Sequence, residues 1–96
     1  MTKIIFKFYI DQKLKRALNG ENYSKAIDRA LRDFINHGYY FLKHNIKFES
    51  NGYMSISLDR QLYRELQEIS RASGKTMSYI INISLFYYLM HCEVVI

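Results

Sequence analysis

The order of predicted elements repeats within the chain, and this repeat constrains the fold more than any other feature. Each half begins with a predicted strand, followed by a short helix, a turn and a longer helix. A shift of 48 residues aligns residues 9–18 with residues 57–66, and a shift of 54 residues aligns residues 22–35 with residues 76–89. Two aligned blocks in the same order indicate an internal duplication, in which the first helix of the first half is six residues shorter.

The first half is predicted to form one strand and two helices. β-Branched and aromatic residues at 3–10 favour a strand. A short helix is expected over residues 12–18. Asn22 can cap a second helix, in which the apolar residues follow the 3.6-residue period. The apolar stripe continues past Gly38, so this helix either ends there or extends toward residue 44.

The second half repeats this order. Residues 53–58 alternate between apolar and other side chains, which predicts a strand with one buried face. Asp59 precedes the first helix of this half as Asp11 precedes that of the first half, and each carboxylate can cap its helix. The helix after Asp59 is expected to reach about Ala72 and to end at Gly74.

Length, cysteine content and charge limit the class of protein. A chain of 96 residues can form one small domain, or two very small units that share a core. The single cysteine excludes an intramolecular disulfide and fits a reducing compartment, so we expect the cytoplasm, or the host cytoplasm for a viral protein. The formal net charge of +5 divides into +6 over residues 1–48 and −1 over residues 49–96. This asymmetry indicates that one half faces an anionic partner or that the two halves have different roles, and a solvated helical face on the first half is the simpler interpretation.

The final helix is predicted from Met77 to about Met90, with Thr76 as its cap, and it is almost wholly apolar. A membrane span needs about 20 apolar residues, and here polar side chains such as Ser78 and Asn82 would have to enter lipid. A buried helix is therefore favoured, and no membrane partner is expected.

Part of the final helix is predicted to bind a second copy of the chain. By alignment with the second helix of the first half, a subset of its side chains suffices for an internal core. The surplus apolar side chains are Tyr79, Ile83, Phe86, Tyr87 and Met90. Surplus apolar surface typically marks an interface, so two chains would associate through residues 77–96. The competing interpretation is that residues 39–48 fold back over this helix.

Four features follow one another in the second half of the chain. They are an alternating strand ending in Leu58-Asp59, a helix with leucines at helical spacing, the segment GKTMS at 74–78 and an apolar helix. With this pattern, residues 53–89 resemble a ribbon-helix-helix unit of the Arc, CopG and MetJ type. Residues 3–35 resemble the same family less closely, because their first helix is shorter.

The resemblance implies a fold in which two units complete each other. A single unit of about 40 residues cannot bury its strand and helices alone, and family members pair so that each chain supplies one strand of a ribbon. Two units in one chain imply an α+β fold: tandem ribbon-helix-helix units in an intramolecular pseudo-dimer, with a two-stranded antiparallel ribbon and four helices. The first unit would be residues 1–38, the connector or helical extension 39–52, and the second unit, with a short C-terminal tail, 53–96.

The resemblance also implies where double-stranded DNA would bind. In the family, the outward face of the ribbon enters the major groove, and the N-terminus of the second helix binds a phosphate. The implied base-reading residues are Ile5, Lys7, Tyr9, Tyr53, Ser55 and Ser57. The implied phosphate-binding residues are Asn22, Tyr23 and Ser24 in the first unit and Thr76, Met77 and Ser78 in the second, with Lys3, Lys25 and Lys75 beside them.

The function implied by the resemblance is that of a sequence-specific DNA-binding transcriptional regulator, a repressor. Small size and a composition rich in Ile, Tyr and Lys indicate a mobile element, such as a virus or plasmid, as its source. The alternative is a protein-interaction or inhibitor module that uses the same scaffold without binding DNA. A third interpretation is an antitoxin, which would need a toxin-neutralising tail, and the last four residues are short for such a tail.

No pattern of catalytic residues is visible in the sequence. The three histidines are scattered, none of them forms an i, i+4 pair, and the chain lacks a glycine-rich phosphate loop. His91 and Cys92 are adjacent, and neighbouring residues do not face each other on a helix. We therefore expect neither an enzyme nor a bound cofactor or metal.

Overall fold

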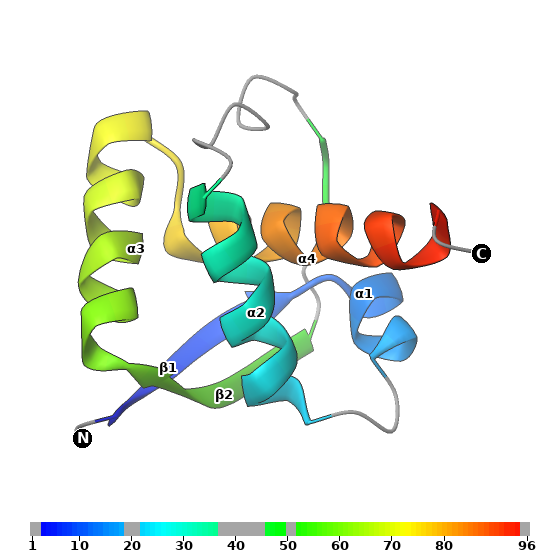
Figure 1. Ribbon diagram of the computed structural model, residues 1–96, viewed down its shortest axis with the longest axis horizontal. Coiled ribbons are helices and arrows are strands. Elements are labelled where there is room, and N and C mark those ends of the chain that lie inside the picture. Colours follow the sequence, from blue (N-terminus) through cyan, green and yellow to red (C-terminus); the bar gives the residue numbers. More distant parts are fainter. Residues whose placement is uncertain (1–2, 19–21, 37–45, 50–51, 95–96) are drawn as a thin grey trace.

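The computed structural model describes residues 3–18, 22–36, 46–49 and 52–94, with side chains described up to Met90. These residues form an α+β fold, as predicted, with one two-stranded antiparallel sheet and four helices (Figure 1). The elements, in chain order, are β1 (Lys3–Ile10), α1 (Gln12–Ala17), α2 (Tyr23–Asn36), β2 (Gly52–Asp59), α3 (Arg60–Ser73) and α4 (Met77–Val94). The predicted extension of the second helix falls on residues 37–45, which lie outside the described residues.

The two strands pair along their full length and form one ribbon. β1 pairs antiparallel with β2 in a register that runs from Lys3 opposite Asp59 to Ile10 opposite Gly52. Because side chains alternate across a strand, the two faces of this ribbon differ. Phe8, Ile10, Ile56 and Leu58 are buried on the inner face, as the sequence predicts. The outer face remains open to solvent.

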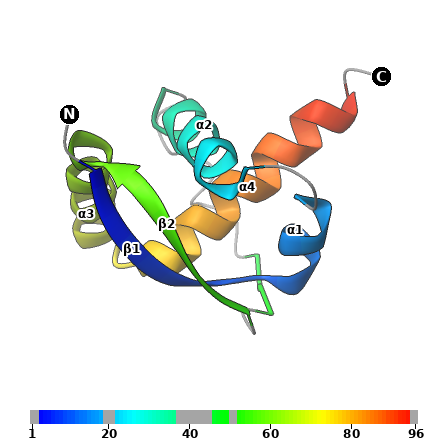
Figure 2. The ribbon, with the colours of Figure 1, turned by 90° about the horizontal axis from the view of Figure 1, so that it is seen from below.

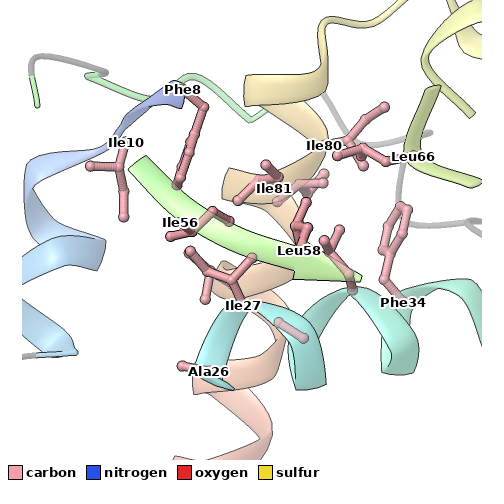
Figure 3. Packing of buried hydrophobic residues seen from close by; sticks show 14 of the residues in the cluster. Phe8, Ile10, Ala26, Ile27, Phe34, Ile56, Leu58, Leu66, Ile80 and Ile81 are labelled. Atoms are coloured by element: carbon pink, nitrogen blue, oxygen red, sulfur yellow. The ribbon is translucent and has the colours of Figure 1, made fainter. Parts of the chain in front are cut away.

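The hydrophobic core lies between the inner face of the ribbon and the helices. Figure 3 shows Ile27 and Phe34 of α2, Leu66 of α3 and Ile80 and Ile81 of α4 around the strand residues. α2 and α4 pack against each other and cross in the view of Figure 2. The shared core therefore joins elements from both halves of the chain. Leu14 of α1, the following residue Leu18, and Leu62 and Ile69 of α3 also belong to it.

Side-chain caps hold three of the helix N-termini. The carboxylate of Asp11 accepts from the backbone N–H groups of Lys13 and Leu14 at the start of α1. The Oδ1 of Asn22 accepts from the Lys25 N–H in α2, and the Oγ1 of Thr76 accepts from the Tyr79 N–H in α4. These three predicted caps are confirmed.

The helix α3 begins and ends as predicted, but the predicted side-chain cap at its N-terminus is absent. Gly74 adopts a left-handed backbone conformation, with φ of 74°, and its N–H donates to the Ser70 carbonyl. The expected cap by Asp59 is wrong, because its side chain makes no capping hydrogen bond. Asp59 is the last residue of β2 and pairs with Lys3, and its charge acts on Arg32 of α2.

The final helix is longer than predicted and partly covered from within the chain. α4 continues to Val94, and Ile83, which the sequence placed among the surplus side chains, is fully buried. The ring of Phe48 lies 5.6 Å from that of Tyr79 and 6.3 Å from that of Phe86, between ring centroids. Residues 46–48 thus fold back over α4, as the competing interpretation expected, while residues 39–45 lie outside the described residues.

Candidate nucleic-acid interface

The six residues predicted to read bases lie together on the outer face of the ribbon. The strand register places them in three cross-strand rows: Ile5 opposite Ser57, Lys7 opposite Ser55, and Tyr9 opposite Tyr53. Ser57 is half-buried, and the other five are exposed. The side chain of Ile5 is 73% exposed, which is unusual for a large aliphatic residue on a strand. The outer face therefore presents a lysine between an aliphatic end and an aromatic end.

The aromatic end of this face is a contact between two tyrosines from different strands. The ring centroids of Tyr9 and Tyr53 are 4.8 Å apart and the rings are tilted by 53°. The two side chains are 54% and 56% exposed. Cross-strand aromatic pairs stabilise a ribbon, and this pair also leaves two phenol groups at the surface.

Two helix N-termini are fixed to the ribbon by a matching pair of hydrogen bonds. The Tyr9 backbone N–H donates to the Oγ of Ser78 at 3.2 Å, which joins β1 to the first turn of α4. The Ser57 N–H donates to the Oγ of Ser24, also at 3.2 Å, which joins β2 to the first turn of α2. The predicted phosphate-binding segments therefore lie beside the ribbon, one near Tyr9 and one near Ser57. The Asn22 and Thr76 caps take the N–H groups of Lys25 and Tyr79. The two preceding N–H groups of each helix lack intrahelical acceptors, so they can bind an anion there.

Asn82 joins α4 to the end of β1, a role that its place in the sequence did not predict. Its side chain is fully buried and forms three hydrogen bonds. The Oδ1 accepts from the Asp11 N–H at 2.8 Å, and the Nδ2 donates to the carbonyls of Tyr9, at 2.9 Å, and Ser78, at 2.7 Å. The available signal was a lone amide in the middle of an apolar helix, but two of its three partners, Asp11 and Tyr9, are more than 70 residues away in sequence.

Lysines surround the outer face. Lys3 and Lys25, which were predicted to bind phosphate, are exposed, and so is the predicted base-reading residue Lys7. Lys75 is half-buried, and its Nζ lies 5.3 Å from the centre of the Tyr79 ring, in a cation–π contact. Each of these four predicted cations lies on the ribbon or in or beside a helix N-terminus that the ribbon contacts.

Lys47 adds a further cation that sequence reasoning missed. A groove beside the N-terminus of α4 is lined by Lys47 together with Tyr9, Thr76, Ser78 and Tyr79. The backbone N–H of Ile46 donates to the Tyr79 hydroxyl at 3.3 Å, and this bond fixes the connector there. Lys47 has no helical or strand periodicity to place it, so its position depends on this long-range contact.

One arginine of α2 is already engaged within the protein. The Arg32 Nε donates to the Asp28 carboxylate at 2.7 Å. This hydrogen bond raises the pKa of Arg32 above its ordinary value, against a smaller opposing effect of desolvation, and the charges of Asp28, Asp59 and Glu65 raise it further. We therefore do not assign Arg32 to the interface.

Within the described ranges, the protein has neither a metal-binding cluster nor a membrane-spanning helix. No group of three or more His, Cys, Asp and Glu side chains there could hold a metal ion. Among the described residues, no helix is both long enough and apolar enough to cross a bilayer. In comparisons with known proteins, no family model, curated protein or solved structure matches the chain.

Proposed function

We propose that the chain is a sequence-specific double-stranded DNA-binding protein, a transcriptional repressor, that reads the major groove with the β1–β2 ribbon. The observation that carries this proposal is the pair of helix N-termini fixed to the ribbon by the hydrogen bonds of Ser24 and Ser78. They provide two anion-binding ends on either side of one exposed, lysine-bearing face.

The proposal includes a pseudo-dimer of two ribbon-helix-helix units. Lys7 and Ser55 are equivalent under the 48-residue shift and lie directly opposite each other, so a two-fold axis would pass between them. Tyr9 and Ser57 are equivalent under the same shift, and Ser24 and Ser78 under the 54-residue shift. The same strand-to-helix hydrogen bond therefore occurs twice, each time from one half of the chain to the other. This reciprocal exchange supports internal two-fold symmetry.

The chemistry of the outer face fits base recognition. The major groove admits a two-stranded ribbon. The ammonium group of Lys7 can donate to the O6 and N7 of guanine, and serine hydroxyls can bond to several bases. The methyl groups of Ile5 can contact the methyl group of thymine. The tyrosines can contact the DNA backbone or a thymine methyl.

One observation favours the alternative function as a protein-interaction or inhibitor module. Ile5, Tyr9 and Tyr53 are large side chains that are more than half exposed on one face of the ribbon. Exposed apolar and aromatic groups of this kind also mark protein-docking surfaces. The lysines and helix N-termini around this face favour a polyanion, so DNA remains the first proposal.

Selection from a random duplex library, followed by gel shift of the selected sequences, tests the proposed function. We expect one enriched sequence family and a specific affinity at least about a thousandfold higher than that for unselected DNA at the same salt concentration. Absence of enrichment, with only weak salt-sensitive binding, would refute sequence-specific recognition. The alternative module would then be tested by its binding to proteins.

A further inference from the structure

We propose that the DNA site of this protein is not a palindrome, and that the chain binds it in one fixed orientation. This inference rests on the proposed function and concerns the kind of DNA sequence that the ribbon selects. It follows from the difference between the two ends of the outer face, which the strand register places on opposite sides of Lys7 and Ser55.

The internal two-fold relation exchanges the two end rows of the outer face, which lie on either side of the central row of Lys7 and Ser55. Under the 48-residue shift, Ile5 is equivalent to Tyr53, and Tyr9 is equivalent to Ser57. The row of Ile5 and Ser57 therefore corresponds to the row of Tyr9 and Tyr53. A symmetric ribbon would carry the same two side chains in both rows, and this ribbon does not.

The two rows differ in the contacts that they can make with bases. One row offers the aliphatic side chain of Ile5, which suits a thymine methyl group, and the small hydroxyl of Ser57. The other row offers two phenol rings whose centroids are 4.8 Å apart. The rows are separated by four residues, or about 13 Å along the ribbon, which corresponds to roughly four base pairs. Each row therefore faces its own part of a site, with a different set of groups.

The charges around the two ends also differ. Under the 54-residue shift, Lys25 in the first turn of α2 corresponds to Tyr79 in α4. Lys25 is exposed, whereas the Tyr79 hydroxyl accepts from the Ile46 N–H. At the α4 end, Lys47 and Lys75 come from the connector and from the turn before the helix. The phosphate contacts of the two ends are thus made by non-equivalent residues.

Three duplexes test the inference with the full-length chain. They are the selected site and two palindromes, each built by inverting and repeating one half of that site. The native protein is expected to bind the selected site about tenfold or more tightly than either palindrome, because each palindrome places the wrong half opposite one row.

Two reciprocal variants give the two end rows of the outer face the same pair of side chains and leave the central row of Lys7 and Ser55 unchanged. The double substitution Tyr9→Ser and Tyr53→Ile gives both rows the isoleucine–serine pair, and Ile5→Tyr with Ser57→Tyr gives both rows the tyrosine pair. We expect each variant to prefer a different palindrome over the selected site. The control, Tyr9→Phe with Tyr53→Phe, keeps both rings and should keep the native preference. Circular dichroism of each variant verifies the fold, since the exchanged side chains lie on the outer face.

The outcomes separate this inference from the proposed function. An enriched sequence that is itself a palindrome, or variants that keep the native order of preference, would overturn the inference and leave DNA recognition standing. Failure to enrich any duplex would instead overturn the proposed function, and the inference with it.

Discussion

The outer-face side chains and the helix-end lysines have different tasks in the proposed complex. Lys7 lies at the centre of the outer face, where its ammonium group can contact base edges. Lys25 lies in the first turn of α2, next to the Ser24 hydroxyl that the ribbon contacts. A base contact affects which sequence is bound, whereas a phosphate contact affects all sequences alike.

Substitution of these two lysines should therefore have distinguishable effects. We expect Lys7→Ala to lower the affinity for the selected site by about 1–3 kcal/mol and to relax base preference nearby. Lys25→Ala should weaken binding to every duplex and reduce the slope of log affinity against log salt by about one. Titrations at several salt concentrations provide both quantities. Equal losses from the two variants, without a change in preference, would contradict the assignment of the ribbon to base reading.

Asn82 stabilises the fold through contacts that only the folded chain brings together. Asn82→Ala would leave the buried Asp11 N–H and the Tyr9 carbonyl without their side-chain partner, at a cost of about 2–4 kcal/mol. Ser84 is a matched control, because it is buried in the same helix but bonds only to the Ile80 carbonyl one turn earlier. We expect Ser84→Ala to cost less than about 1 kcal/mol in urea denaturation. Similar losses from both substitutions would show that Asn82 has no special role.

At the scale of elements, the two aspartates before α1 and α3 occupy equivalent positions in the sequence repeat but make different hydrogen bonds. Asp11 is buried, and its carboxylate accepts from three backbone N–H groups, those of Lys13, Leu14 and Glu49. Asp59 makes no capping hydrogen bond. The contact of Asp11 with Glu49 also ties α1 to the connector, since these residues are 38 positions apart.

The two aspartates therefore predict unequal costs of removal. We expect Asp11→Ala to lower the free energy of unfolding by about 2–3 kcal/mol, because the substitution removes a buried helix cap and leaves three backbone N–H groups without their acceptor. Asp59→Ala should change it by less than about 0.5 kcal/mol. Thermal or urea unfolding of the two variants, side by side, measures the difference. A larger loss from Asp59→Ala would mean that the caps are assigned to the wrong helix.

Local patterns predicted the elements well because each pattern depends on neighbours in the sequence. β-Branched and aromatic residues predicted the first strand, alternation predicted the second strand with its buried face, and Gly74 marked the end of α3. The sequence did not predict the side-chain direction of Asp59, the partners of Asn82 or the position of Lys47. Each of these depends on a contact between distant segments, for which no local spacing gives a signal.

At the scale of the whole molecule, the connector limits how much of α4 is available to other chains. Phe48 contacts Tyr79 and Phe86, and Ile83 is buried. Tyr87 packs against the core and against the ring of Phe86, so four of the five side chains expected at an interface are already in contact within the chain. Met90 is 43% exposed, and it is the last residue of α4 whose side chain the structure describes. Association of two chains through this end of α4 stays a proposal.

Light scattering during gel filtration tests that proposal. Two associated chains would have a mass of about 23 kDa, twice the 11.5 kDa of one chain. Met90→Lys should reduce the mass to that of one chain, because a charge would have to be buried in the interface. A native protein of 11.5 kDa at micromolar concentration would contradict association through α4.

The central claim, that the outer face of the ribbon binds DNA, is tested most directly by NMR titration of the labelled full-length chain with its selected duplex. We expect the largest amide shift changes in two places, namely the outer-face residues of β1 and β2 and the first turns of α2 and α4. Amides in the middle of α3 should change little. Shift changes confined to α1, α3 or the C-terminal end of α4, with an unaffected ribbon, would contradict the account.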